Sequence, residues 1–274
     1  MADASKNVGV SEYDSYSCGR LEKAFQTNSK EKISFTDKDG KKHSVSVKNM
    51  TDDVIDGSNA YSAKVKRIPT ESTKLPDRWD PMASGETHKL VDLSSVGSEF
   101  MRVEKHFRAT SNNLIKSIIK IQRIQNPSLY RQYKVKMLSM ESDLPLYGGK
   151  KIEMRLWHGT SSDVIPKINS NNFNRSYGGV HGLVYGNGVY FAVNSQYSIS
   201  GYCTPDVHGR KYIYQARVLV GNAGQGAFGL KEPPLKDPAK GILYDSVVDR
   251  LNAPSMYVIF YDYQMYPEYL ITFQ

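Results

Sequence analysis

The stretch at positions 156–162 reads LWHGTSS, in which a histidine follows two large apolar residues. The apolar residues predict the end of a buried strand, and Gly159 and Thr160 come directly after His158. An imidazole in such a place can hydrogen-bond a ligand, and it can equally be a satisfied core histidine before a turn. The residues elsewhere in the chain have to decide between these two interpretations.

Aromatic and hydroxyl side chains recur in the segments that follow. Tyr190 lies in a second strand bounded by glycines, Tyr197, Ser198 and Tyr202 form a cluster after it, and a late aromatic strand covers 256–261. Tyrosine rings stack on flat rings, and glycine lets backbone amides approach a ligand closely. With the strand-end histidine, these residues suit a flat, neutral, hydrogen-bonding ligand such as a nicotinamide ring and its ribose.

The histidines do not form a metal-binding pattern. None of the six has another histidine, a cysteine or a paired carboxylate one helical turn away. Asp206 and His208 stand beside Pro205 and Gly209, which indicates a loop rather than a ligand-bearing strand. The sequence therefore predicts no metal site. The histidines are His43, His88, His106, His158, His181 and His208.

Glycine-rich phosphate loops are not found either. The run GNG at 186–188 begins like a dinucleotide-binding fingerprint, but the third glycine would have to stand where the chain has Phe191. A strand rather than a helix is expected to follow, and no P-loop or nucleophile-elbow motif occurs. A Rossmann fold and a P-loop are therefore ruled against.

Composition indicates a folded protein of a reducing compartment. Cys18 and Cys203 lie far apart and form no disulfide framework, so we expect an intracellular protein, cytoplasmic or nuclear. No stretch reaches the length of a membrane span, and we expect no membrane partner. The net charge of +8 is scattered, which favours a solvated surface and leaves nucleic-acid binding a weak third option.

The first part of the chain predicts a helix and a hairpin. The run 15–27 has apolar residues at helical spacing, and the alternating stretches 32–37 and 42–50 are joined by a turn. From 51 to 75 the composition becomes polar, and we place a domain boundary near 72.

The second part of the chain predicts a mixed α+β unit. Phe100, Val103 and Phe107 share one helix face, 112–126 becomes strand-like towards its end, and 128–140 is helical. Beyond 150, short apolar runs are cut by glycines, which is typical of a largely β unit, with one helix at 162–171. The predicted fold class is α+β.

Several motifs, in this order, resemble one known family. RLWHGTSS, YGNGVYFAVNSQYS and YVIFYDYQMYPEYLITF are similar to the catalytic domain of the poly(ADP-ribose) polymerase-like ADP-ribosyltransferases of the diphtheria-toxin type, nearest to the mono-ADP-ribosylating branch with the macrodomain-bearing members. The resemblance covers about 75–274 and implies two packed, mainly antiparallel sheets with flanking helices in a catalytic domain at 73–274. Segment 1–72 resembles the latter part of a WWE domain, which suggests a fragment or a lineage that lost half of that domain.

The resemblance assigns NAD⁺ as the donor substrate and gives roles to the residues above. His158 would hydrogen-bond the ribose beside nicotinamide, and Gly159, through its backbone, and Ser198, through its hydroxyl, would hold the carboxamide. Tyr202 would stack on one face of nicotinamide and Tyr190 on the other. Looser candidates for the adenosine end are Arg175, Thr160 and Ser161.

The third member of the family's His-Tyr-Glu triad is replaced. Aligning Asp262 on the family's final strand puts Met256 at the glutamate position, with a margin of one residue towards Tyr257. No acidic residue lies between Asp249 and Asp262, so a shifted alignment does not restore the carboxylate. A thioether cannot act as general base, so transfer of single ADP-ribose units to protein acceptors is expected and chain elongation is not.

A second hypothesis is a weak or inactive transferase fold that binds NAD⁺ or ADP-ribose and recruits partners. The missing carboxylate and the WWE resemblance motivate it. Against an ADP-ribose reader, segment 1–72 contains no tryptophan, because the two of the chain are Trp79 and Trp157.

Overall fold

The computed structural model describes residues 13, 15–26, 30–65, 74–142, 147–149, 151–175 and 183–274. The chain divides into two compact units, Met1–Pro69 and Thr70–Gln274, close to the boundary predicted near 72. His181, one of the six histidines, lies outside the described residues, as does position 72 itself.

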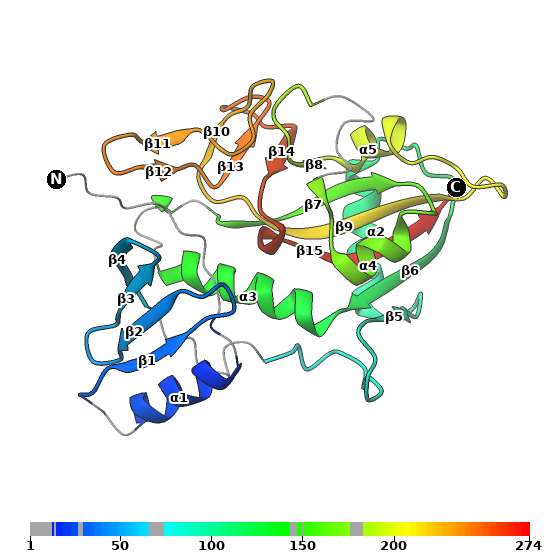
Figure 1. The fold of residues 1–274 in the computed structure, drawn as a ribbon. Helices are drawn as coiled ribbons and strands as arrows, with labels where there is room; N and C mark the ends of the chain where they lie inside the picture. The colour runs from blue at the N-terminus through cyan, green and yellow to red at the C-terminus, as the bar shows by residue number, and fades with distance from the viewer. Residues whose placement is uncertain are drawn as a thin grey trace. The chain divides into compact units, whose positions relative to one another are not determined.

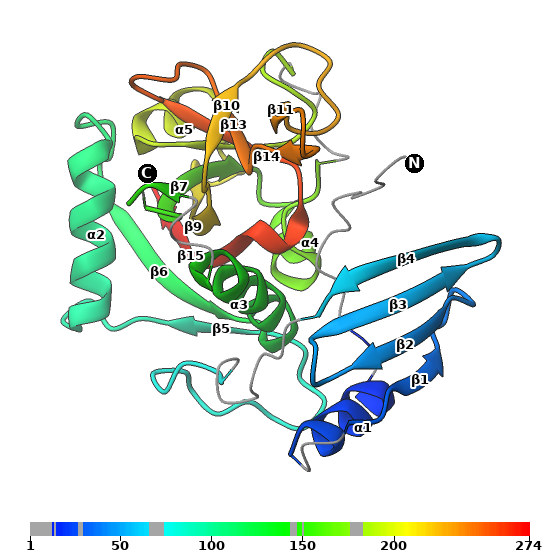
Figure 2. The same ribbon diagram turned by 90° about the vertical axis from the view of Figure 1, so that its left-hand side faces the viewer.

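The N-terminal unit is a four-stranded antiparallel sheet with one helix, α1, beside β1 (Figure 2). The predicted helix and first two strands are confirmed, and the polar segment from 51 onward, for which the sequence predicted no strand, forms a second hairpin. The elements are α1 (Ser15–Gln26), β1 (Ile33–Thr36), β2 (Lys42–Ser46), β3 (Thr51–Asp56) and β4 (Asn59–Lys64).

A buried carboxylate explains why such a polar segment forms a strand. Asp52 is 2% exposed and accepts hydrogen bonds from the Tyr13 hydroxyl at 2.7 Å and the Ser44 backbone at 3.1 Å. His43 lies 2.6 Å from the same carboxylate and 3.3 Å from Asp37. Burial lowers the pKa of His43, but its bonds to the two carboxylates outweigh this and raise it. The polar groups satisfy one another, so β3 can bury its inner face.

The C-terminal unit is built on a nine-stranded sheet in the order β10-β13-β14-β8-β7-β9-β15-β6-β5 (Figure 1). Every pairing is antiparallel except the short one between β10 and β13. The α+β class is therefore confirmed. The strands are β5 (Lys89–Asp92), β6 (Ile118–Gln125), β7 (Glu153–Thr160), β8 (Val189–Ala192), β9 (Lys211–Leu219), β10 (Ala223–Gln225), β13 (Ser246–Val248), β14 (Met256–Ile259) and β15 (Met265–Phe273), with a separate hairpin of β11 (Leu235–Asp237) and β12 (Ile242–Leu243).

The two halves of this sheet meet at a single position. β7 pairs with β9 over its whole length, but its ladder with β8 consists of the pair Trp157 and Ala192. The two sheets that the family resemblance implies are thus the two halves of one continuous sheet, joined by this single pair. Beyond Trp157, β7 has no ladder partner on its β8 side among the described strands.

Four α-helices and a 3-10 turn cover this sheet. Figure 1 shows α3 lengthwise beside the sheet, where it packs against β15. The predicted face of α2 is buried through Phe100, Val103 and Phe107. The expectation of one helix beyond 150 missed α5, whose seven residues are mostly small and polar. The elements are α2 (Ser98–Thr110), α3 (Pro127–Ser142), α4 (Ile165–Asn171), α5 (Ser195–Gly201) and η4 (Asp262–Gln264). Within the described ranges, no helix is long and apolar enough to cross a bilayer.

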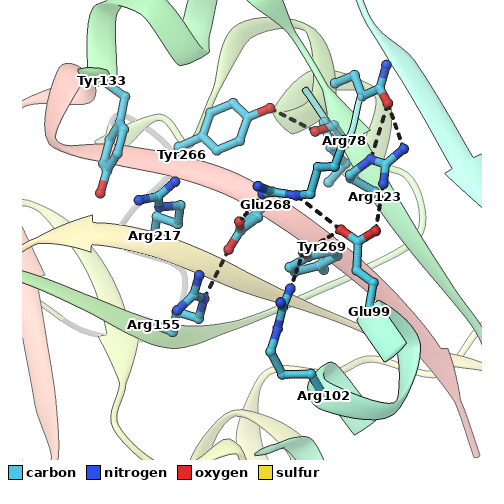
Figure 3. Close-up of polar contacts among 12 residues, drawn as sticks. Arg78, Glu99, Arg102, Arg123, Tyr133, Arg155, Arg217, Tyr266, Glu268 and Tyr269 are labelled. Carbon is cyan, nitrogen blue, oxygen red and sulfur yellow. Dashed lines mark hydrogen bonds and ion pairs between the residues drawn. The ribbon is translucent and has the colours of Figure 1, made fainter. Parts of the chain in front are cut away.

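A buried glutamate on strand β15, between β9 and β6, ties the start of this unit to its sheet (Figure 3). Glu268 is 1% exposed and accepts hydrogen bonds from Arg78 at 2.8 Å and Arg155 at 3.1 Å. Next to it, Glu99 on α2 accepts hydrogen bonds from Arg123 at 2.6 Å and from the Tyr269 hydroxyl at 2.7 Å. The same charges therefore join the segment before β5 to α2, β6, β7 and β15.

Replacing Glu268 with glutamine tests this role. The variant keeps the shape of the side chain but removes one of the two charge partners of Arg78, which also pairs with Glu99, and the charge partner of Arg155, and we expect the free energy of unfolding to fall by about 3 kcal/mol. Thermal or urea unfolding of the whole chain measures the loss. The control is Glu104→Gln, which breaks the surface pair with Arg108 and should cost less than about 1 kcal/mol. Equal small losses in both variants would show that the buried charge is dispensable.

Candidate active site

His158 is held on β7 by aromatic rings and one backbone carbonyl. Its ring centroid lies 4.9 Å from that of Phe173 and 5.5 Å from that of Phe191. Its Nδ1 atom lies 2.9 Å from the carbonyl oxygen of Tyr190. A carbonyl only accepts, so Nδ1 carries the hydrogen and the neutral ring presents Nε2 as an acceptor. Burial lowers the pKa of His158, and the bond to Tyr190 offsets this in part, so the ring is neutral at pH 7.

Gly159 lets helix α5 approach β7. A Cβ atom at this position would lie 2.9 Å from Cys203 Sγ, 2.9 Å from the carbonyl oxygen of Ser198 and 3.0 Å from the carbonyl carbon of Tyr202. Any side chain would therefore push the end of α5 away from the strand. The Ser198 hydroxyl donates to the carbonyl of Trp157 at 3.4 Å. The structure thus brings His158 and Gly159 together with two of the predicted carboxamide and stacking residues.

The backbone carbonyl of Tyr190 bonds His158, while the phenol of Tyr190 is hydrogen-bonded to the loop before β8. The Tyr190 hydroxyl donates to the carbonyl of Gly186 at 2.9 Å and accepts from the backbone of Tyr185 at 3.0 Å. The glycines of the 186–188 run serve packing, because a Cβ at Gly188 would lie 2.5 Å from the carbonyl oxygen of Ile259. A strand, β8, follows this run, as the argument against a dinucleotide loop expects.

The register of β14 places Met256 on the face that carries Tyr190. Met256 pairs with Ala192 and Val258 pairs with Tyr190, so these side chains point to the same side of the sheet. Tyr257 pairs with Phe191 and points to the opposite side. Met256 is 6% exposed. The residue that shares the face of Tyr190 is therefore the thioether, and no carboxylate stands in this strand.

A cavity of about 680 Å³ lies along α5. The rings of Tyr197 and Tyr202 stack with centroids 5.5 Å apart, and their hydroxyl oxygens are 3.3 Å apart. The hydrogen bond with Tyr202 is the largest cause that raises the pKa of Tyr197 to about 12, followed by burial. The phenol of Tyr197 is therefore a neutral partner for a ligand. The lining residues include Asn194, Gln196, Tyr197, Ser200, Tyr202 and Ser255.

The candidates for the adenosine end lie at different places. Thr160 is 6% exposed, and its hydroxyl donates to the carbonyl of Ser161 at 3.4 Å. Both residues therefore follow directly after His158 and Gly159 at the end of β7. Arg175 is exposed and donates to the carbonyl of Lys231 at 3.3 Å. The structure therefore does not bring Arg175 into contact with His158.

Sequence reasoning missed one pair beside Met256. Asp249 accepts hydrogen bonds from the backbone of Ser255 at 2.9 Å, from the Ser255 hydroxyl at 2.6 Å and from the backbone of Met256 at 3.2 Å. An aspartate followed across a short loop containing Asn252 and Pro254 by a serine is a signal for such a loop closure. Among the described residues, no group of three or more His, Cys, Asp or Glu side chains is placed to hold a metal ion.

Comparison with known proteins identifies the family. The model of the poly(ADP-ribose) polymerase catalytic domain matches residues 97–274. The chain is 40% identical over 219 residues to the human protein mono-ADP-ribosyltransferase PARP14, a match that covers 79% of this chain and 12% of the relative. It is 36% identical over 201 residues to mouse protein mono-ADP-ribosyltransferase PARP12, covering 73% of this chain and 27% of the relative.

A further relative matches along nearly its whole length. Human protein mono-ADP-ribosyltransferase PARP11 is 32% identical over 304 residues, covering 99% of this chain and 85% of the relative. The chain thus spans a small part of the first two relatives and most of the third. The ordered motifs, the antiparallel sheet and these matches agree, and the chain belongs to the family of poly(ADP-ribose) polymerase catalytic domains.

Proposed function

We propose that the chain is an NAD⁺-dependent protein mono-ADP-ribosyltransferase, which transfers one ADP-ribose unit to a protein side chain and releases nicotinamide. The observation that carries the proposal is the neutral His158, bonded to the carbonyl of Tyr190, in a sheet where Met256 shares the face of Tyr190. The three relatives described above are all named protein mono-ADP-ribosyltransferases, which supports the proposal.

His158, Gly159, Ser198 and Tyr202, which we call the clamp, suit the nicotinamide end of NAD⁺. Nε2 of His158 is free to accept a hydrogen bond from a ribose hydroxyl, because Nδ1 is occupied by Tyr190. Among the described strands, none pairs with β7 beyond Trp157 on its β8 side, which supports contact between backbone groups at Gly159 and a carboxamide. The backbone of Ser198 and Tyr202 lies against Gly159, and the Ser198 hydroxyl donates to the carbonyl of Trp157, which supports a role of these two residues in holding the amide and stacking on the ring.

The same groups explain the chemistry. Cleavage of the bond between nicotinamide and ribose passes through an oxocarbenium-like state, as in glycoside hydrolysis. Holding both parts in one orientation lowers the barrier without any acid or base. Extension of a chain also requires a hydroxyl of bound ADP-ribose to lose its proton, and the thioether of Met256 cannot accept it. Transfer of a single unit to a protein acceptor is the reaction left.

Two further proposals concern the N-terminal segment and the location of the protein. We infer that segment 1–72 is a partial WWE-like unit, supported by its single helix and antiparallel sheet, and that its ADP-ribose binding is doubtful because it contains no tryptophan. An intracellular place, cytoplasmic or nuclear, is supported by the two cysteines, Cys18 and Cys203, neither of which forms a disulfide.

Incubation with labelled NAD⁺ tests the proposed function. We expect label on the chain itself or on proteins of a lysate, and mass spectrometry should find one ADP-ribose unit at each modified position. Long polymers on the product would contradict the single-unit reaction. No label on any protein would contradict the transferase and favour a binding protein with the same fold.

The pH dependence of nicotinamide release tests the state of His158. Because burial lowers its pKa, the ring stays neutral as pH falls to 6.5, and the rate should decline only below that value, as Nε2 takes up a proton. His158→Ala should reduce transfer at least about 100-fold at all pH values with little loss of thermal stability. The control is His208→Ala, in an exposed loop, which should leave the profile unchanged. Large destabilisation with residual activity of His158→Ala would indicate a purely structural histidine.

Met256→Glu tests how far the third position determines the product. We expect the variant to keep adding single units, because elongation also requires a site that binds the acceptor ADP-ribose. The side chain is 6% exposed, so a carboxylate there is desolvated and should lower the melting temperature. Gel analysis of labelled products measures chain length, and Met256→Gln, similar in size but unable to ionise, is the matched control. Polymers made by the glutamate variant alone would show that one carboxylate suffices.

A further inference from the structure

Tyr197 and Tyr202 face each other at the end of α5. Their ring centroids lie 5.5 Å apart with an angle of 28° between the planes, and their hydroxyl oxygens are 3.3 Å apart. Tyr197 belongs to the helix, and Tyr202 is the residue at which the helix ends. Both line the cavity along α5. The two rings therefore form one stacked unit in the wall of this cavity.

The backbone of Tyr202 is fixed independently of this stack. Its N–H donates to the carbonyl of Ser198 at 2.9 Å, and the N–H of Cys203 donates to the same carbonyl at 3.1 Å. A Cβ atom at Gly159 would lie 3.0 Å from the carbonyl carbon of Tyr202, so this main chain lies directly against β7. These contacts hold the main chain, whereas the rotation of the side chain is set by what the ring touches. Tyr197 is such a contact.

Tyr197 stands on a held backbone but contributes little to the core. Its N–H donates to the carbonyl of Asn194 at 3.3 Å, and its neighbours Ser195 and Ser198 are buried. The side chain of Tyr197 itself is 44% exposed, so its removal leaves no buried void. An effect of Tyr197 on ligand binding is therefore separable from an effect on folding.

We propose that Tyr197 is a positioning residue of the donor site, which holds the ring of Tyr202 in the orientation that stacks on nicotinamide. The inference rests on the proposed transferase function, in which Tyr202 stacks on one face of nicotinamide and Tyr190 on the other. A ring has two faces, and Tyr197 lies against one face of Tyr202, so nicotinamide stacks on the opposite face. The order of rings in the complex is then Tyr197, Tyr202, nicotinamide and Tyr190.

The stack acts on the nicotinamide half of NAD⁺ alone. A tyrosine ring that nothing restrains populates several orientations, and the ligand binds the fraction of molecules in which the ring is correctly placed. Restraining the ring beforehand removes this cost from binding. The ring of Tyr202 contacts nicotinamide both before and while the bond to ribose breaks, so the gain is in binding rather than in the rate of cleavage. ADP-ribose contains no nicotinamide and gains nothing.

Tyr197→Ala tests the stack in the full chain. Ligand-observed NMR titrations measure the Kd for nicotinamide and for ADP-ribose, and steady-state kinetics gives KM and kcat for NAD⁺. We expect Tyr197→Ala to weaken nicotinamide binding about 5-fold, the effect of one aromatic pair, and to raise the KM for NAD⁺ by a similar factor. The kcat should stay within about 2-fold of the wild type, and ADP-ribose binding should not change.

Three further variants separate positioning from other roles. Tyr197→Phe keeps the ring and should bind nicotinamide as the wild type does. Phe228→Ala removes a ring that is 84% exposed and does not line the cavity, and it is the matched control. Tyr202→Ala removes the ring that Tyr197 is proposed to hold, so adding Tyr197→Ala to it should weaken nicotinamide binding no further. The same loss from Tyr197→Ala in both backgrounds would overturn the positioning role.

The outcomes separate this role from the function on which it rests. If the wild type transfers ADP-ribose and Tyr197→Ala binds nicotinamide equally well, the positioning role is overturned and the transferase stays intact. Equal losses of nicotinamide and ADP-ribose binding in Tyr197→Ala would also overturn it, because they would indicate damage to the whole donor site. A wild type that binds neither nicotinamide nor NAD⁺ would overturn the transferase and the positioning role together.

Discussion

The active site of this fold depends on the place where two strands stop pairing. β7 and β8 are joined at Trp157 and Ala192 and nowhere else in their ladder. One residue further on, a side chain replaces the missing backbone bonds, since Nδ1 of His158 donates to the carbonyl of Tyr190. This bond holds the two halves of the sheet at a fixed separation and orients the imidazole with Nε2 free. A fully paired ladder would have closed the edge of β7 and left no backbone group for a ligand.

The clamp depends on the contacts that hold helix α5 against β7. A helix of seven residues is not stable alone, so α5 takes its position from tertiary contacts. Gly159 allows the close approach to β7, and Thr110 on α2 bonds the first residue of α5, Ser195, through their hydroxyls at 2.9 Å. Ser195 also donates to the carbonyl of Phe107 at 3.2 Å. The buried face of α2 therefore fixes the helix that carries Ser198, although α2 itself does not reach the clamp.

The sequence predicted those features that follow from apolar periodicity. The faces of α2 and α3, the strand-like texture beyond 150 and the position of His158 at the end of a strand all follow from the spacing of large apolar residues. The elements that the sequence did not predict depend on hydrogen bonds between polar groups and on close backbone packing. β3 is a strand because several partners satisfy Asp52, and α5 is a helix because Ser195 and Gly159 hold it in place. The bond from Asp249 to Ser255 crosses a loop, and no periodic pattern marks it.

The substitution at Met256 separates two tasks that a glutamate would combine. The groups that we propose for the donor site include no carboxylate: they are an imidazole, backbone at the strand edge beyond Trp157, a serine hydroxyl and tyrosine rings. None of these groups needs a carboxylate at position 256 for its orientation, because His158 is oriented by Tyr190 and Ser198 by Trp157. The proposed donor site therefore keeps its geometry when a thioether replaces the carboxylate, because a partner outside position 256 orients each of these two side chains.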